Sequence, residues 1–233
     1  IYSMMDNVSF TNCIIQNNEA LNTGGGLYDS LKAGGQSGYH TNCIITGNIA
    51  GSKGGGVYMG LAFGGLYDCE ISNNSADEGG GIYSYFGIWA GIFSCRIINN
   101  NSTSDGGGIK SIISDQFTFY DNIISGNSAG GSGGGMHLQD GTDQTILHSC
   151  LFSGNLANTG AGIYAINFDG SFINFTVAAN RSLANGGGIA NNSSNSLIKN
   201  AIIYGNTSVP AATAAFYNVA STPDVDYSLV QGG

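Results

Sequence analysis

The chain has 233 residues, of which 39 are glycine and 2 are proline; 9% are charged, and the formal net charge is −9 at pH 7. The acidic balance argues against a nucleic-acid partner, and no apolar run reaches the about 18 residues that predict a membrane span. The glycines are clustered rather than placed at every third position, which excludes collagen, and a hydrophobic content of 42% argues against disorder.

Apolar residues alternate over short stretches of each repeat, as in the first complete one. There Cys13 and Ile15 flank Ile14, Asn18 follows, and a glycine triplet at 24–26 precedes Leu27. Such alternation, rich in β-branched residues, predicts short strands, and no useful stretch shows the 3.6-residue period of a helix. The glycine triplets supply corners where a Cβ would clash.

Asparagine recurs once in each repeat. The series is Asn18, Asn48, Asn74, Asn100, Asn127, Asn155, Asn180 and Asn206. The spacing runs from 25 residues (Asn155 to Asn180) to 30 residues (Asn18 to Asn48), which indicates a stacked-repeat architecture. Because an amide both donates and accepts hydrogen bonds, identical amides one strand apart can form a ladder along the axis.

Short strands with one apolar face are stable only when stacked coils bury that face. The sequence therefore predicts an all-β, single-domain, right-handed parallel β-helix of about eight to nine coils of about 26 residues, with an asparagine ladder and Gly-Gly-Gly corners. Residues 1–233 form one such segment. Ile1 and Tyr2 align with the end of a coil, and 225–233 align with 10–18. We therefore expect a segment of a longer polypeptide, cut at both ends within the repeat.

The repeat resembles those of secreted right-handed β-helix proteins of bacteria, in particular the polymorphic outer-membrane-protein repeats built from G-G-A-[ILV] and F-x-x-N. Phe119-Tyr-Asp-Asn122 fits the second element and Gly79-Gly-Gly-Ile82 approximates the first. Cysteine replaces the asparagine of F-x-x-N in five coils, so the resemblance is to the broader repeat type. The ending 226–233 is similar to segments of Bacteroidetes-type cell-surface β-helix proteins. The resemblance implies an extracellular or cell-surface location, in an architecture that hosts polysaccharide lyases, adhesins and structural proteins alike.

Five cysteines share one inward column of the predicted coils. They are Cys13, Cys43, Cys69, Cys95 and Cys150. We expect a stack of buried thiols that behave as small apolar residues. Neighbours one rung apart would also lie within bridging range, so Cys13–Cys43 or Cys69–Cys95 disulfides stay open as the alternative. No metal site is expected here, because no histidine falls in register beside the thiols.

An outward row follows the glycine triplets. It reads Tyr28, Tyr58, Tyr83, Lys110, His137, Tyr164 and Ala190. Aromatic rows beside bare glycine backbone suit sugar rings, although tyrosine is also an ordinary exposed strand residue. The variable segment after this row holds an aromatic group, with flanking rings at Phe63 and Phe117. The group contains Tyr85, Phe86 and Trp89. These side chains either bind a ligand or pack into the corner of the core.

Two further columns are candidate contact sites. Ile14, Ile44, Ile123, Leu151 and Ile202 should point outward, interrupted by Glu70 and Arg96. Such an aliphatic stripe indicates self-association or a covering loop. Asp77, Glu78 and Asp105 cluster at one corner, with Lys53 one coil away. This corner is either solvated or a calcium site.

These patterns predict a non-enzymatic extracellular or cell-surface module, which acts as an adhesin-like spacer or as a filament or matrix component and contacts glycans or other surface proteins. Self-association through the stripe or the open solenoid ends is a further expectation. No cofactor, nucleic acid or membrane insertion is expected. The alternative is a carbohydrate-active β-helix, a lyase or hydrolase of an acidic glycan, with calcium at the acidic corner. Against it, the six basic residues are scattered, and a lyase needs a placed Lys or Arg.

Overall fold

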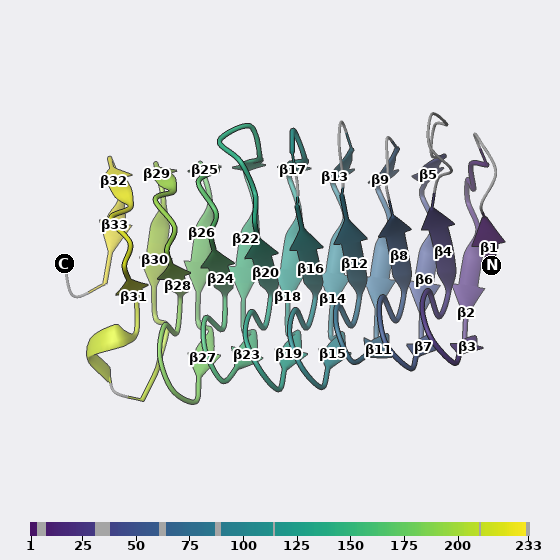
Figure 1. The fold of residues 1–233 in the computed structure, drawn as a ribbon, viewed down its shortest axis with the longest axis horizontal. Coiled ribbons are helices and arrows are strands. Elements are labelled where there is room, and N and C mark those ends of the chain that lie inside the picture. The colour runs from purple at the N-terminus through teal and green to yellow at the C-terminus, as the bar shows by residue number, and fades with distance from the viewer. Residues whose placement is uncertain are drawn as a thin grey trace.

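The computed structural model describes residues 1–3, 8–30, 38–60, 64–86, 90–113, 115–209 and 211–231. Short strands stack side by side from the N-terminal to the C-terminal end of a solenoid (Figure 1). All pairs of neighbouring strands are parallel and keep one register, as where Glu70 pairs with Arg96 and Ile71 with Ile97. The prediction of an all-β parallel β-helix is confirmed.

The strands form four sheets, named here in the order used below. Sheet A contains β1 (Tyr2–Ser3), β4 (Leu27–Ser30), β8 (Val57–Gly60), β12 (Ile82–Tyr85), β16 (Ile109–Ile112), β20 (Met136–Gln139), β24 (Ile163–Ile166), β28 (Ile189–Asn192) and β31 (Phe216–Val219). Sheet B contains β5 (Tyr39–Thr41), β9 (Gly65–Tyr67), β13 (Gly91–Phe93), β17 (Thr118–Tyr120), β21 (Ile146–His148), β25 (Ser171–Ile173), β29 (Leu197–Lys199) and β32 (Asp224–Asp226).

Sheets C and D complete each coil. Sheet C contains β2 (Ile14–Gln16), β6 (Ile44–Thr46), β10 (Glu70–Ser72), β14 (Arg96–Ile98), β18 (Ile123–Ser125), β22 (Leu151–Ser153), β26 (Thr176–Ala178), β30 (Ile202–Tyr204) and β33 (Leu229–Val230). Sheet D contains β3 (Glu19–Ala20), β7 (Ile49–Ala50), β11 (Ser75–Ala76), β15 (Asn101–Ser102), β19 (Ser128–Ala129), β23 (Leu156–Ala157) and β27 (Arg181–Ser182). From β5 to β28, each coil passes through sheets B, C, D and A in turn.

The described ranges hold one helix, the short 3-10 helix η1 (Ala211–Thr213). No helix in those ranges is long and apolar enough to cross a membrane.

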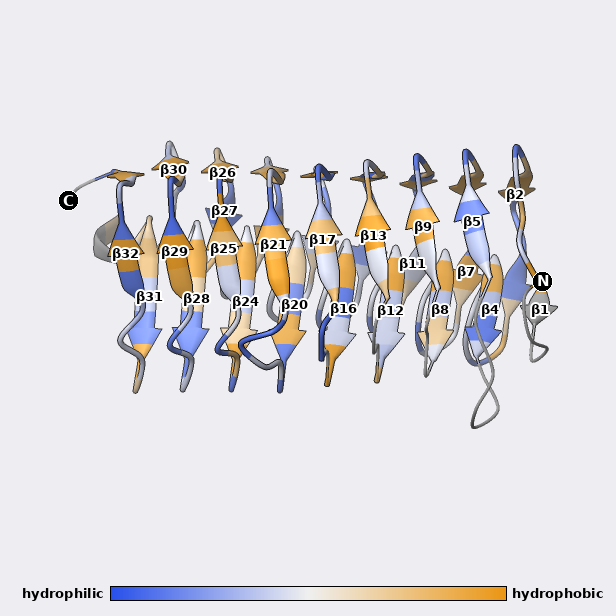
Figure 2. Ribbon diagram, turned by 90° about the horizontal axis from the view of Figure 1, so that it is seen from above, coloured by the Kyte–Doolittle hydropathy of each residue, from blue (hydrophilic) through white to orange (hydrophobic). Residues whose placement is uncertain are grey.

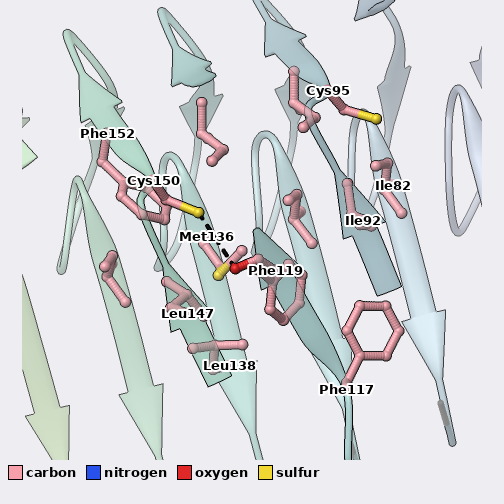
Figure 3. Packing of buried hydrophobic residues seen from close by; sticks show 14 of the residues in the cluster. Ile82, Ile92, Cys95, Phe117, Phe119, Met136, Leu138, Leu147, Cys150 and Phe152 are labelled. Atoms are coloured by element: carbon pink, nitrogen blue, oxygen red, sulfur yellow. Dashed lines mark hydrogen bonds between the residues drawn. The ribbon is translucent and has the colours of Figure 1, made fainter. Parts of the chain in front are cut away.

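The core runs without interruption along the solenoid axis. Figure 3 shows side chains from different sheets pointing into one interior, among them Met136 from sheet A, Phe119 from sheet B and Phe152 from sheet C. All three are fully buried. Because strands of only two to four residues each place one or two side chains inside, stacking many coils is what makes this apolar volume continuous.

The glycine triplets lie where the chain turns from sheet D into sheet A. At Gly25 an added Cβ would come within 2.3 Å of the carbonyl oxygen of Gly55, so the two neighbouring corners touch through their backbones. Gly24 has a φ of +67°, in the left-handed region that favours glycine. The triplets therefore allow close packing of one corner upon the next.

Candidate functional site

The periodic asparagines form a continuous ladder at the corner between sheets C and D. Each Nδ2 donates to the Oδ1 of the asparagine in the next coil, over 2.9 to 3.1 Å, from Asn18 through Asn206. The same Oδ1 also accepts the neighbouring backbone N–H, as from Asn100 to Asn127 over 2.9 Å. The second amide hydrogen of Asn127 goes to the carbonyl oxygen of Ile97. Every polar atom of such a side chain is thus used.

The sharp backbone turn belongs to the residue before each ladder asparagine, not to the asparagine itself. That residue takes φ values between 54° and 68°, as at Asn17, Asn73 and Gly126. The ladder asparagines themselves therefore do not take the left-handed conformation. They are selected for their amides, and the preceding position supplies the turn.

All five cysteines are free thiols, and four of them are buried. The backbone N–H of Cys43 points to the sulfur of Cys69 over 3.4 Å, and Cys69 repeats this contact with Cys95. Burial raises the pKa of the Cys150 thiol to about 11, so that it carries no charge at neutral pH. Cysteine therefore acts in this column as a small ladder residue, much as Asn122 does where its Oδ1 accepts the N–H of Cys95.

The tyrosines of the outward row on sheet A stack on one another. The rings of Tyr28 and Tyr58 lie 4.8 Å apart and nearly parallel, and those of Tyr58 and Tyr83 lie 5.6 Å apart. Tyr83 is only 2% exposed, so the expectation of an open outward row is wrong there. Burial, followed by the neighbouring phenols, raises the pKa of Tyr58 to about 12. Tyr28 and Tyr58 are half-buried and Tyr83 is buried, so less ring surface faces solvent here than an open row would offer.

Farther along the same row, Lys110 is buried within a charge cluster. Its ammonium group donates to the carboxylate of Glu78 and to Asp105 Oδ2, the latter over 3.1 Å. Lys53 Nζ lies 3.8 Å from Glu78 Oε2 and 4.7 Å from the ring centre of Tyr83. Both carboxylates belong to residues that directly precede a glycine triplet. At that position the side chains reach over the outer face of sheet A.

The pKa values in this cluster follow from competition between burial and pairing. Burial favours neutral Lys110, but its hydrogen bond to Glu78 and the charge of Asp105 outweigh this effect, and the pKa of Lys110 is raised. Burial likewise favours neutral Asp105, but the N–H of Ser132 and the ammonium group of Lys110 lower its pKa nonetheless. The two groups are therefore ionised at neutral pH.

His137 follows Lys110 in the row and is also buried. Its Nδ1 lies 3.8 Å from Asp105 Oδ1, and its ring leans against Tyr164 with centres 5.0 Å apart. Burial is the main cause that lowers the pKa of His137 to about 4. The imidazole is thus neutral at physiological pH, beside the ionised Asp105 and Lys110. Tyr164 itself is half-buried and its hydroxyl meets Asn192 Nδ2 at 3.4 Å.

The acidic corner divides into two parts. Asp77 is exposed and accepts a hydrogen bond from the hydroxyl of Thr103, whereas Glu78 and Asp105 turn to Lys110. Within the described ranges, no group of three or more His, Cys, Asp or Glu side chains is placed to hold a metal ion. A lysine ammonium thus occupies the position in which the calcium hypothesis would place the cation.

The aromatic corner is only partly described. Tyr85 and Phe86 are exposed and their ring centres lie 6.1 Å apart, whereas Phe117 is fully buried against Phe119. Phe63 and Trp89 lie outside the described residues. The core-packing alternative is therefore right for Phe117, while Tyr85 and Phe86 face solvent.

A second aromatic row lies on the outer face of sheet B, which the sequence reasoning missed. Its members are Tyr39, Tyr67, Phe93, Tyr120 and His148. Tyr67 stacks on Phe93 with centres 4.7 Å apart, and Tyr120 stacks on His148 at 5.2 Å. Tyr39 and Tyr120 are about half exposed, at 52% and 46%. The signal was present in the sequence, because four of these rings precede the cysteine column by two residues in consecutive coils.

Glycines make room for this sheet B row. A Cβ on Gly91 would lie 2.4 Å from the ring of Phe93, and one on Gly65 would lie 3.1 Å from the ring of Tyr67. Each ring thus lies over the glycine two residues before it, and it covers backbone that would otherwise meet water. The pairing Gly-x-aromatic is the local feature that lays the rings along the sheet.

A buried polar pair inside the solenoid was also missed. Asp29 of β4 and His40 of β5 face inward, and Asp29 Oδ2 lies 3.2 Å from His40 Nε2. The other ring nitrogen of His40 accepts the backbone N–H of Phe10 over 3.3 Å. Both side chains are almost fully enclosed, so this pair is satisfied within the core and faces no surface on which a substrate could bind.

The described surface contains no pocket. What it offers instead are flat sheet faces: the sheet B aromatic row, and an aliphatic column on sheet C formed by exposed residues such as Ile14, Ile44 and Ile202. In Figure 2 the strands of sheet C run along the upper edge, largely in the hydrophobic colour.

Residues 68–85 match the family model of the Chlamydia polymorphic membrane protein repeat. The matched stretch covers β10, β11, one glycine triplet and β12, which is most of one coil. The chain is thus a β-helix repeat protein that resembles this repeat type. No curated protein matches the chain, and no solved structure does.

Proposed function

We propose that this chain is a non-enzymatic module of a surface-exposed protein, which acts as a rigid spacer and contacts glycans through the sheet B aromatic row. The observation that carries the proposal is the row of aromatic side chains on the flat outer face of sheet B, in which Tyr39 and Tyr120 are about half exposed. Sugar rings present apolar faces and hydroxyl edges, and half-exposed aromatic rings with phenolic hydroxyl groups match both. The likeness to a repeat of membrane proteins supports the surface location.

The rigid spacer follows from the ladders. Asparagine amides link the coils from Asn18 to Asn206 without a break, and four sheets continue on either side of them. Each coil contacts only its neighbours, so the length of such a rod scales with the number of repeats. A face that keeps its register over many coils holds its aromatic side chains in a fixed line.

The tyrosine hydroxyl groups of the sheet B row are suited to donate hydrogen bonds. Burial, with a smaller contribution from the neighbouring Tyr39, raises the pKa of Tyr67 above its ordinary value. The phenol therefore keeps its proton at neutral and mildly alkaline pH. A neutral donor beside an apolar ring favours neutral sugars over strongly anionic ones, which the net negative charge of the chain would repel.

Glycan contact is tested by binding the whole chain to an array of neutral and acidic oligosaccharides. We expect binding without turnover, weakened about fivefold or more by Tyr120→Ala, because an aromatic contact contributes on the order of 1 kcal/mol or more. Tyr204→Ala is the matched control, since Tyr204 is a tyrosine on sheet C that is 62% exposed, against 46% for Tyr120. Equal losses in the two variants, or no binding at all, would rule out the sheet B row as the glycan site.

The rival function, an enzyme acting on an acidic glycan, gains no support from the acidic corner. Glu78 and Asp105 share the ammonium group of Lys110, which leaves neither carboxylate free to bind a calcium ion. Calcium-dependent depolymerisation of an acidic polysaccharide, abolished by Asp105→Asn, would overturn the non-enzymatic proposal.

A further inference from the structure

One column of sheet C forms an exposed aliphatic stripe, which is here called the sheet C stripe. It consists of the first residue of each strand: Ile14, Ile44, Glu70, Arg96, Ile123, Leu151, Thr176, Ile202 and Leu229. Ile14 is 66% exposed, Ile123 37% and Ile202 48%. A row in which most side chains are exposed and aliphatic indicates a contact surface.

The only charges within the stripe are Glu70 and Arg96, which lie in adjacent coils. Glu70 Oε2 is 3.6 Å from Arg96 Nε, and both side chains are more than a third exposed. From β2 to β22 the order is therefore aliphatic, aliphatic, acidic, basic, aliphatic, aliphatic. Read in reverse, this order places an acid where a base stood and an aliphatic residue where an aliphatic residue stood. The stripe is complementary to its own reversed copy.

We propose that two copies of this chain pack face to face through the sheet C stripe, related by a two-fold axis between β10 and β14. The axis lies in the interface and runs parallel to the strands, so that it reverses the order of coils but keeps the stripe opposite itself. Glu70 then faces Arg96 of the second copy, Ile44 faces Ile123, and Ile14 faces Leu151. Each contact occurs twice, as in any isologous dimer.

The charges select this arrangement among its neighbours. A two-fold axis moved by half a coil in either direction would place Glu70 against Glu70 or Arg96 against Arg96. An axis parallel to the solenoid would also place each charge against itself. Because like charges held opposite one another are strongly unfavourable, only the proposed register pairs both.

The rest of the face fits the same register. The last residues of β2 to β22 form the second outward column, and all are uncharged: Gln16, Thr46, Ser72, Ile98, Ser125 and Ser153. At the corner between sheets B and C, Asp68 would face Ser94 of the second copy, and Asp121 would face Asn42. No acidic side chain meets another.

The contact is narrow, and this sets the expected affinity. Six strands at a spacing of about 4.8 Å give a contact of roughly 29 Å in length. Its width is one short strand, so the buried area falls at the low end for specific interfaces. We therefore expect a weak dimer whose population rises with concentration, and which is strengthened where many copies are held on one surface.

Charge complementation tests the proposal directly. Sedimentation velocity of the intact chain up to roughly 1 mM should show a monomer–dimer equilibrium. Arg96→Glu and Glu70→Arg should each stay monomeric, because each places like charges opposite one another. An equimolar mixture of the two variants should form a heterodimer at least as well as the wild type, since every Glu then faces an Arg. Far-ultraviolet circular dichroism checks that both variants are folded.

A matched pair of aliphatic variants tests the register. Ile123→Asp lies inside the predicted overlap and should weaken the dimer about tenfold or more, whereas Ile202→Asp lies outside it and should leave the dimer unchanged. The proposal is overturned by a wild-type chain that stays monomeric, by a dimer insensitive to Arg96→Glu, by a mixture of charge variants that does not associate, or by equal effects of the two aspartates.

Discussion

The asparagine ladder and the outward row of sheet A run along the same solenoid but use opposite strategies. The ladder repeats one residue type in every coil from Asn18 to Asn206, and each amide is held by an identical neighbour. The row begins with three stacked tyrosines and then changes to Lys110, His137, Tyr164 and Ala190, where unlike neighbours such as Glu78 beside Lys110 hold the side chains. A ladder of identical side chains requires the same residue type in every coil. A row held by unlike neighbours allows the residue type to change from coil to coil.

The physical reason lies in what each side chain needs. A buried amide has N–H donors and an oxygen acceptor. Another amide in the next coil can accept its hydrogen bond on one side, and an amide in the previous coil can donate to it on the other. A buried ammonium group is repelled by its own kind and requires carboxylates above and beside it. The repeated residue therefore lies at the corner that holds successive coils together, and the variable residues lie on the outer face of sheet A.

The largest expected effect is a break in the middle of the ladder. Asn127→Ala removes the acceptor for the backbone N–H and the Nδ2 of Asn100, and leaves the carbonyl oxygen of Ile97 without its donor. Because several buried polar groups lose partners at once, we expect a loss of about 4 kcal/mol in the free energy of unfolding, measured by urea denaturation. Asn18→Ala, at an exposed position, is the control and should cost about 1 kcal/mol or less.

A loss of similar size in both asparagine variants would mean that burial does not govern the ladder. A loss under about 1 kcal/mol at Asn127 would mean that water replaces the missing amide within the corner.

The next largest effect is a pH dependence of folding stability, caused by His137 in the outward row of sheet A. Folding lowers the pKa of His137 to about 4, below its ordinary value of 6.5. Between pH 6.5 and 4 the unfolded chain binds a proton that the folded chain does not, so this residue destabilises the fold as the pH falls through that window. The full effect is on the order of 3 kcal/mol. Urea titrations at several pH values should show that His137→Tyr removes this slope, whereas His148→Tyr, in the sheet B row, keeps it.

A smaller effect is expected from the ammonium group itself. Lys110→Met keeps the length of the buried side chain but leaves Glu78 and Asp105 facing each other without a cation. Both carboxylates are about a quarter exposed, so water screens part of the repulsion, and we expect a loss of about 2 kcal/mol at pH 7. Lys53→Met, where the lysine side chain is 38% exposed, should cost under about 1 kcal/mol. If the two lysine variants were equally destabilised, burial of Lys110 would not be the cause.

The repeated sequence patterns were enough to predict the fold. Alternating residues around Cys13, the glycine triplets and the spaced asparagines each require a neighbour directly above, and a parallel β-helix is the architecture that gives one. The sheet B row was also within reach of the sequence, since Gly65-Leu-Tyr67 and Gly91-Ile-Phe93 repeat in consecutive coils.

The charge cluster around Lys110 and the buried pair of Asp29 and His40 could not be predicted by aligning the repeats. Asp105 and Lys110 stand in different columns of one coil, and Glu78 stands in the coil before, so their meeting depends on how the glycine corner folds over sheet A. Asp29 and His40 meet across the interior from two sheets, over a connection whose length varies from coil to coil. A periodic alignment shows which residues stack, but contacts between columns depend on the cross-section of the coil.

The smallest expected effect separates folding from association. Glu70 and Arg96 form an exposed pair at 3.6 Å, and such pairs contribute about 0 to 1 kcal/mol to folding. At micromolar concentration, where the chain is monomeric, Arg96→Glu should therefore change the urea midpoint only slightly, although it abolishes the dimer at high concentration. The same variant would then disturb one face of the solenoid and leave its interior intact. A large loss of monomer stability would instead place Arg96 among the residues that build the fold, as Asn127 is.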